Sequence, residues 1–412
     1  MNTALSPSGS GNRYQQLALL ATAELFTMAL WFSASAVVPE LRDAWGLTNS
    51  DAAWLTMSVQ IGFVTGAFIS AALTLSDVWD PRRLIAGSAV LGATATAAIP
   101  AFADGMALAV PLRFVTGLAL AGVYPPGMKI MAGWFRDGRG MAMGVMIGAL
   151  AIGSATPHVL RPLGVAGSWQ MLLYAAAVLA LIGATIARLG LRTGPHQTPA
   201  AAFDPRAVRR ILGDRATMLA NGGYFGHMWE LYAVWTWVPT FLAASFAADQ
   251  SAATTQETAS YLAFLTIAIG GLGSTAAGVL ADRIGRTLIT IVSMIVSGAC
   301  CIMIGFLFGG PTWLVVVVCL IWGFAVVADS AQFSTCISEL GEPEYVGTAL
   351  TLQTAVGFLI TVVTIRLLPV WESAWGWEWA FAPLVIGPAV GTWSMFALRR
   401  RPESRRIAGG RR

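Results

Sequence analysis

The sequence predicts an all-α integral membrane protein of twelve transmembrane helices, arranged in two pseudo-symmetric six-helix bundles. Of its 412 residues, 56% are hydrophobic and only 11% are charged, which is too little polar surface for a soluble chain of this length. The apolar residues form runs of about 20, long enough to cross a bilayer as a helix. Runs this long and this continuously apolar do not fit the alternating strands of a membrane barrel.

Twelve such runs follow one another along the chain. Several exceed the minimum length for crossing a bilayer, so we expect tilts or kinks, with Pro125, Pro126 and Pro157 as candidate kink sites. The runs cover residues 15–38, 51–75, 83–103, 106–132, 140–160, 168–190, 216–245, 259–281, 287–308, 312–338, 346–369 and 379–398.

Basic residues lie mostly on one side of this arrangement. With the N-terminus inside, 20 of the 25 Lys and Arg residues fall in inner loops and termini, seven of them after Leu398. Cytoplasmic loops hold the excess of Lys and Arg. We therefore expect a multi-pass protein of a bacterial cell (inner) membrane with both termini in the cytoplasm. The basic tail is expected to anchor this topology rather than to bind nucleic acid.

The two halves of the chain repeat each other at a spacing of about 206 residues. "ELFTMALW" at 24–31 returns as "ELYAVWTW" at 230–237, which places Glu24 and Glu230 at equivalent points, and Gly117 matches Gly323 in the same way. Internal repeats are typical of secondary transporters, whose substrate site lies between them near the membrane midplane. We expect an N-terminal bundle at 1–190, a central cytoplasmic loop at 191–215, a C-terminal bundle at 216–398 and a basic cytoplasmic tail at 399–412.

Several motifs carry a resemblance to a known family. "GVLADRIGRT" at 278–287 is similar to the loop between helices 8 and 9 of the major facilitator superfamily, and "RFVTGLALAG" at 113–122 resembles its helix 4. "WFRDGRGMAMG" at 134–144 resembles the loop between helices 4 and 5. The first-half counterpart "LTLSDVWDPRR" at 73–83 lacks both glycines and the arginine that follows the aspartate. The resemblance covers the whole chain and implies transport by alternating access.

The resemblance also implies that the loop motif controls opening at the inner side. Asp282 ends a span, and Gly285 permits a tight turn between Arg283 and Arg286. A carboxylate at this level can face the positive N-terminal end of a neighbouring helix. Such a contact would hold the inner side closed; the alternative is a basic turn without a gating role. The matching residues of the first copy are Asp77, Arg82 and Arg83.

Four charged residues lie deep within spans, where each costs about 2.5–3.5 kcal/mol to insert. Glu24, Arg113, Glu230 and Asp329 fall in spans 1, 4, 7 and 10, one in each. In the superfamily that this chain resembles, these four helices line the central cavity. We therefore expect the four side chains to face the transport path.

Glu230 is the expected proton site. Removal from water favours the protonated form of a carboxyl group, and His227 lies three residues earlier on the same helical face. Glu24, with Trp31 on its face, and Trp237 are further expected cavity residues. The tryptophans can stack on a flat or cationic solute, or they can simply pack. Asp329 is expected either at the transport path or in helix packing.

The role of Arg113 and the charge of the solute are left open by the sequence. Arg113 can pair with Glu24, bind an anionic solute or take part in coupling. Lys129, near the inner end of its span, is interpreted as snorkelling to the interface. Three deep acids favour a neutral or cationic solute, whereas Arg113 together with Lys129 would suit an anion. Three histidines in the chain are a thin ligand set, so we expect no metal site.

The combined prediction is a secondary active transporter that moves a small organic solute across the membrane by alternating access, coupled to protons. The sequence contains no phosphate-binding loop of the Gly-x-x-x-x-Gly-Lys-Ser/Thr type, and we expect neither an enzyme nor a cofactor. The expected partners are the solute, protons and the lipid bilayer, and the chain is expected to be a monomer. The alternatives are a uniporter or facilitator, a transporter-like sensor, or a drug or metabolite exporter.

Overall fold

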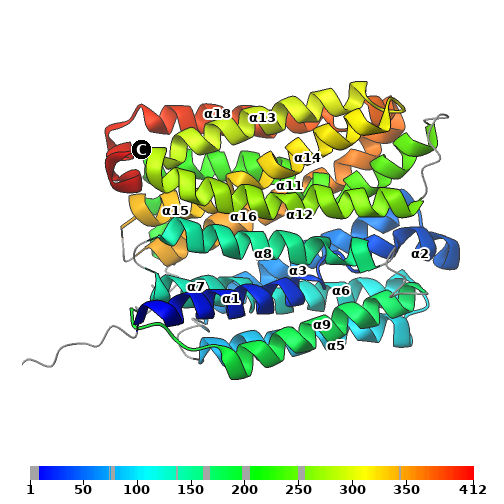
Figure 1. Cartoon of the computed structure of the whole chain (residues 1–412), viewed down its shortest axis with the longest axis horizontal. Coiled ribbons are helices and arrows are strands. Elements are labelled where there is room, and N and C mark those ends of the chain that lie inside the picture. Colours follow the sequence, from blue (N-terminus) through cyan, green and yellow to red (C-terminus); the bar gives the residue numbers. More distant parts are fainter. Residues whose placement is uncertain are drawn as a thin grey trace, which may run out of the picture.

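The computed structural model describes residues 9–73, 75, 79–135, 138–160, 168–196, 205–248, 256–342 and 345–412. Regular structure in this part of the chain is entirely helical, and long helices lie side by side, with the N-terminal half on one side of the molecule and the C-terminal half on the other (Figure 1). Eleven helices within these ranges are long and apolar enough to cross a membrane, and they match eleven of the twelve predicted runs. The predicted fold class is confirmed.

The first run is the exception, because its helix breaks inside the bundle. α1 (Gly9–Met28) ends at Met28, turns follow, and a short 3₁₀ turn, η1 (Ser35–Val37), leads into α2 (Val38–Trp45). The other helices of this half are α3 (Asn49–Ala72), α5 (Pro81–Phe102), α6 (Met106–Leu120), α7 (Tyr124–Trp134), α8 (Arg139–Leu160) and α9 (Trp169–Gly190).

The C-terminal half follows a linking helix, α10 (Pro205–Gly213). Its longest helices are α11 (Arg215–Ala248), α12 (Gln256–Ile284) and α16 (Val346–Trp375). The others are α13 (Arg286–Phe306), α14 (Thr312–Ala328), α15 (Ser330–Leu340), α17 (Trp377–Ala380) and α18 (Ile386–Arg399), with 3₁₀ segments η2 (Ala382–Val385) and η3 (Pro402–Gly410).

The fourth and tenth spans are broken at equivalent points. The fourth consists of α6 and α7, and the tenth consists of α14 and α15; their second parts begin at Tyr124 and Ser330, 206 residues apart. Discontinuous helices at corresponding positions of two repeats are the usual sign of a transport site between them. The breaks therefore mark the level of the membrane at which a site is expected.

Gly117 and Gly323, matched by the sequence repeat, make the same contact in each half. A Cβ atom at Gly117 would lie 2.0 Å from the Val59 carbonyl oxygen of α3, and one at Gly323 would lie 1.8 Å from the Thr266 carbonyl oxygen of α12. Only glycine allows these backbones to approach so closely. The shared contact explains why both halves keep a glycine at this position.

The two halves meet along two seams. At the first, α8 packs on α12 (Figure 1) through glycines: a Cβ atom at Gly144 would lie 2.7 Å from the Ser274 carbonyl oxygen, and one at Gly278 would lie 2.5 Å from that of Gly140. Gly148 continues the row one turn further along α8. At the second seam, α3 packs on α16, and the rings of Phe63 and Phe358 lie 4.5 Å apart.

One end of the bundle carries most of the described basic residues, and we call it the basic end. It holds α10, the turn between α12 and α13, and η3; Figure 1 shows the chain end C there, with α2 at the opposite end. α10 is amphipathic: Ala207 and Ile211 are buried, whereas Arg206, Arg209 and Arg210 are exposed. Part of the predicted central loop is therefore a helix.

Candidate functional site

A cavity of about 420 Å³ lies between the two halves. The N-terminal half contributes residues of α7 and α8, and the C-terminal half contributes residues of α11, α14, α15 and α16. Along α8 the lining runs from Arg139 to Leu150, and along α16 it runs from Val346 to Phe358. Both helices start at the basic end, so the cavity occupies that half of the molecule and stops near the middle.

Six aromatic side chains close the cavity toward the opposite end. The ring of Trp31, in the broken part of the first span, lies 5.2 Å from Phe63, 5.5 Å from Tyr232 and 5.7 Å from Phe358. These contacts join the N-terminal half to α11 and α16 of the C-terminal half. We call the set the aromatic seal; it comprises Trp31, Phe32, Phe63, Tyr232, Trp235 and Phe358.

His227 and Asp329 form an ion-pair contact at the cavity wall. His227 Nδ1 lies 2.9 Å from Asp329 Oδ1, although the two atoms are not aligned as a hydrogen bond. His227 Nε2 lies 2.9 Å from Ser330 Oγ, and His227 and Ser330 both line the cavity. Asp329 sits at the break between α14 and α15 and does not cap either helix with its side chain. The Asp329 carboxylate is therefore connected to the cavity by the His227 imidazole, which contacts the carboxylate with one nitrogen and the cavity residue Ser330 with the other.

Glu230 faces away from the cavity. Its Oε1 atom accepts hydrogen bonds from Ser297 Oγ at 2.5 Å, Cys301 Sγ at 3.2 Å and Trp322 Nε1 at 2.5 Å. Ser297 and Cys301 belong to α13 and Trp322 belongs to α14, so the carboxyl group binds three helices of one half together. Glu230 is not among the cavity-lining residues, and its expected proton-carrying role is left untested by this geometry.

Glu24 is buried, and neither oxygen of its carboxyl group has a hydrogen-bond partner among the described residues. It is not a lining residue either, but it lies within electrostatic reach of Tyr124, which is one. Burying a carboxyl group without partners is costly. Glu24 therefore lacks the hydrogen bonds that stabilise the buried carboxyl group of Glu230 within its own bundle.

Arg113 does not pair with Glu24; it caps the broken first span. Its guanidinium donates to the Leu30 carbonyl oxygen at 2.8 Å, to the Leu55 carbonyl oxygen at 3.2 Å and to that of Trp31. It also donates to Ser33 Oγ at 3.2 Å. Carbonyls past the end of a helix lack partners within it. Arg113 satisfies two of them and thereby fixes the backbone that carries the Trp31 ring of the seal.

The remaining sequence-predicted cavity residue, Trp237, donates through Nε1 to the Ile365 carbonyl oxygen at 3.1 Å and does not line the cavity. Lys129, interpreted as snorkelling, does line it. Sequence reasoning also missed Arg139 and the serines of α15. The only signal for these serines was their spacing of four residues, which puts them on one helical face. Within the described ranges, no cluster of three or more His, Cys, Asp or Glu residues could hold a metal.

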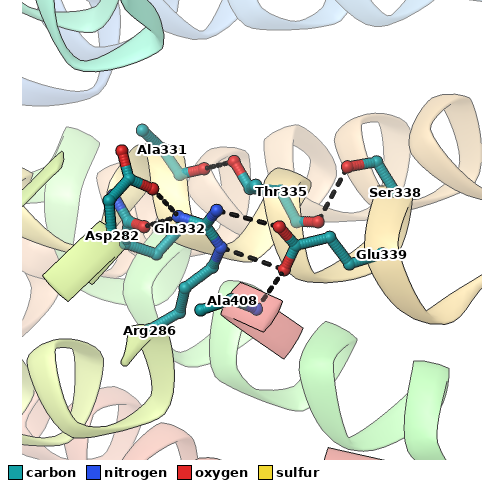
Figure 2. A network of polar contacts seen from close by, with 8 residues as sticks. All are labelled: Asp282, Arg286, Ala331, Gln332, Thr335, Ser338, Glu339 and Ala408. Carbon is teal, nitrogen blue, oxygen red and sulfur yellow. Dashed lines mark hydrogen bonds and ion pairs between the residues drawn. The ribbon is translucent and has the colours of Figure 1, made fainter. Parts of the chain in front are cut away.

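The second copy of the loop motif forms a connected network at the basic end (Figure 2). Arg286 donates to both carboxylate oxygens of Glu339, at 3.0 and 2.8 Å, and to Gln332 Oε1 at 3.0 Å. Its Nη1 also lies 3.2 Å from Asp282 Oδ1. A Cβ atom at Gly140 would lie 2.5 Å from Asp282 Oδ2. The Asp282 carboxylate of α12 is thus packed on the first turn of α8, across the boundary between the halves.

The C-terminal tail docks on this network. The Ala408 N–H donates to Glu339 Oε2 at 2.9 Å, which Figure 2 also shows, and Ile407 beside it is fully buried. Gly285 has a φ of +104°, and a Cβ atom there would lie 2.1 Å from the Arg412 carbonyl oxygen. Arg283 is exposed beside it. The glycine therefore serves both the turn and the contact with the tail.

In the part of the chain that the structure describes, the first copy of the motif makes its contacts within the N-terminal half: besides the pair below, Arg82 Nη1 donates to the carbonyl oxygen of Leu191, which follows α9, at 3.3 Å. Arg82 binds Asp80 in a bidentate pair, with Nε 3.0 Å from Oδ1 and Nη2 2.6 Å from Oδ2. The hydrogen bond from Arg82 holds the pKa of the Asp80 carboxyl below its ordinary value. Arg83 is exposed, and Asp77 lies outside the described residues.

Asp282→Asn should favour separation of α12 from α8 at the basic end. The neutral amide loses the attraction to the helix N-terminus, worth about 0.3–1 kcal/mol when exposed and up to about 2 kcal/mol when partly buried, and it loses the ion pair with Arg286. We expect faster labelling of a cysteine placed at Ser338 by a membrane-impermeant thiol reagent. Asp80→Asn is the matched control, because its partner Arg82 belongs to the same half. If both variants are labelled at the wild-type rate, the turn between α12 and α13 has no gating role.

The family model of the Major Facilitator Superfamily matches residues 20–365 and 222–412, which together cover nearly the whole chain. The probable sulfoacetate transporter SauU of Cupriavidus necator is 26% identical over 281 residues; the match spans 61% of this chain and only 60% of that relative. The MFS transporter asaE of Aspergillus flavus is 24% identical over 333 residues, spanning 76% of this chain and 70% of the relative.

Solved structures share the fold. The proton:xylose symporter XylE superposes with a TM-score of 0.72 at 12% identity, over 94% of this chain and 96% of that one. A bacterial homologue of the human lysosomal transporter Spinster superposes with a TM-score of 0.70 at 13% identity, over 95% and 98% of the two chains. With a family model that matches both halves, a repeated six-helix architecture and a cavity between the repeats, the chain belongs to the Major Facilitator Superfamily.

Proposed function

We propose that this transporter carries a small organic solute by alternating access and that the present structure opens its site toward the basic end. The observation that carries the proposal is the cavity, which takes its walls from both halves and ends at the aromatic seal. A site between two rigid halves is exposed to one side at a time when the halves rock about it. The two seams would then separate alternately.

The basic end is proposed to be cytoplasmic. Arg and Lys in short loops stay on the cytoplasmic side, and α10, the α12–α13 turn and the C-terminal tail supply most of the described basic residues. Both termini would lie on that side of a bacterial inner membrane, with the division into bundles at 1–190 and 216–398 as the sequence suggests. A small organic solute is supported by SauU, a probable sulfoacetate transporter, and by XylE, a proton:xylose symporter.

We further propose that transport is coupled to protons at His227 and Asp329. His227 lines the cavity and contacts both Asp329 and the lining residue Ser330. Binding of a solute in the cavity would therefore depend on whether the His227–Asp329 pair holds a proton. Asp, Glu and His side chains inside membrane bundles often form proton relays. Glu230, the proton site expected from the sequence, accepts hydrogen bonds from side chains of α13 and α14. It is proposed to hold these helices together.

Cysteine labelling from each side of the membrane tests the proposed function. Ser334→Cys, in the cavity, should react with an impermeant thiol reagent added at the cytoplasmic side, and transported solute should change its rate. Ser168→Cys, at the exposed N-terminus of α9 at the opposite end, should react only from outside at a rate that solute leaves unchanged. Reconstituted protein should also exchange labelled solute in counterflow. Reaction of Ser334→Cys from outside alone would contradict the proposed sidedness.

A further inference from the structure

The charged residues that line the cavity are all basic. Lys129 of α7 and Arg139 of α8 line it, and no Asp or Glu does so among the described residues. Both cations come from the N-terminal half, and His227 faces them from α11. A cavity with this lining raises the local concentration of anions and disfavours cations.

Two acids near the cavity, Asp329 and Glu339, are engaged with partners, whereas Glu24 near Tyr124 is buried outside the lining. Asp329 is paired with His227 behind the wall. Glu339 lies within electrostatic reach of Arg139, but both of its carboxylate oxygens bind Arg286. Among the described residues, the charged side chains that line the cavity are therefore basic, and these two acids are held outside the lining.

The lining also offers uncharged donors. The hydroxyl groups of Tyr124, Tyr224 and Tyr232 have no hydrogen-bond partner in the part of the chain that the structure describes, and all three residues line the cavity. The hydroxyls of α15 are used differently: Ser334 donates to Gln353 Oε1 at 3.1 Å, and Ser338 donates to the Thr335 carbonyl oxygen at 2.8 Å. Unused donors suit a solute that brings acceptor oxygens.

The apolar part of the lining lies toward the seal. Leu150, Leu231, Trp235 and Phe358 stand at the closed end, whereas Arg139 is the first residue of α8 at the basic end. Apolar walls with a few oriented polar groups are typical of small-molecule sites of this volume. The two ends of the cavity therefore suit two different parts of one solute.

We propose that the transported solute is a small organic anion with an apolar body. Its carboxylate or sulfonate group binds Lys129 and Arg139, and its body lies against the aromatic seal. The inference rests on the proposed function, since it names the solute class of the same cavity. Of the two solute charges that the sequence leaves open, it selects the anion, because Glu24 and Glu230 are not among the lining residues whereas Lys129 is.

Matched probes that differ only in charge test this proposal. Benzoate, benzamide and benzylamine share a ring and carry a negative, zero and positive charge; propionate with propionamide, and ethanesulfonate, extend the set to smaller bodies and to the other oxyanion. We expect at least one anion to raise the melting temperature of the purified protein in a concentration-dependent way, while its amide or amine counterpart does not. An equal or larger shift with benzamide or benzylamine, or no shift with any anion, would overturn the proposal.

Variants locate the anion. Lys129→Gln and Arg139→Gln should each weaken binding of the stabilising anion about 10- to 100-fold, because a hydrogen bond to a charged partner is lost. Arg83→Gln, exposed at the basic end outside the cavity, is the control and should bind as wild type does. Unchanged binding in both cavity variants would place the anion elsewhere and refute the site.

Counterflow separates this inference from the proposed function. If the anion binds as described but is not exchanged across proteoliposomes, the anion site stands and transport of that anion fails. If a neutral or cationic probe is exchanged and the anions are not, transport stands and the proposed solute class is wrong.

Discussion

Asp329→Asn should abolish accumulation of solute in response to an imposed pH gradient. A difference of one pH unit is worth about 1.4 kcal/mol, so one proton per solute supports a gradient of about tenfold. Asparagine keeps the shape of the side chain at the break between α14 and α15, where Asp329 caps neither helix, but it cannot exchange a proton with His227. We expect counterflow to persist, because exchange does not require the empty carrier to return. The measurement is uptake into proteoliposomes with and without the gradient.

Glu230→Gln is the decisive comparison. Glutamine keeps an oxygen for Ser297, Cys301 and Trp322, which belong to the same half, so this variant should still concentrate solute. His227→Gln should resemble Asp329→Asn. If Glu230→Gln loses the response to the gradient while Asp329→Asn keeps it, the proton is carried where the sequence alone suggested. If all three variants concentrate solute, transport is not proton-coupled through these groups.

Arg113→Gln should strongly destabilise the N-terminal half. Arginine supplies donors to three carbonyls and one hydroxyl, and glutamine cannot reach them all. The Leu30 carbonyl would keep Ser33 Oγ as a donor, at 2.9 Å, but the Trp31 carbonyl would have no other side-chain donor among the described residues. A buried acceptor left without a donor costs about 1–3 kcal/mol in soluble proteins and less within membrane bundles. With the other charged hydrogen bonds of Arg113 also lost, we expect a loss of about 2–4 kcal/mol in the free energy of unfolding. Thermal unfolding of the purified protein in detergent measures it.

Two comparisons show that capping of the first span is responsible for this effect. Arg366→Gln removes an arginine that is exposed on α16 and should leave the melting temperature nearly unchanged. Glu24→Gln should not reproduce the loss, because Arg113 has no contact with Glu24. A melting temperature of Arg113→Gln equal to that of the wild type would show that the carbonyls find other donors. A loss in Glu24→Gln as large as in Arg113→Gln would point to a coupled pair.

The fold was predictable because the signals for it are local in the sequence. Runs of about 20 apolar residues specify the number of helices without knowledge of packing. The break of the first span after Met28 was not predictable, because the donor that satisfies it, Arg113, comes from α6. The helix α10 was hidden in a polar segment, where only Ala207 and Ile211 show the buried face.

The sequence predicts which charged residues of the site are buried in the bundle, but not which way their side chains point. Glu24, Arg113, Glu230 and Asp329 are buried, as their place in the spans requires. When a helix is apolar on all sides, its sequence does not show which of its faces points to the cavity and which packs against neighbouring helices. Glu230 faces α13 because Ser297, Cys301 and Trp322 offer donors there. Lys129 faces the cavity instead of the interface because α7 lies at the boundary between the halves.

The glycine seam between α8 and α12 affects how sequence variation in relatives should be interpreted. At Gly140, Gly144 and Gly278 the backbone of one half touches that of the other, so even an added methyl group has no room. A mutational scan scored by growth or uptake would find these positions as intolerant as Lys129 or His227, although they need touch no solute. A position that tolerates no substitution must therefore be checked for whether its side chain faces the cavity. Only positions that do face it are suitable for changing which solute the transporter carries.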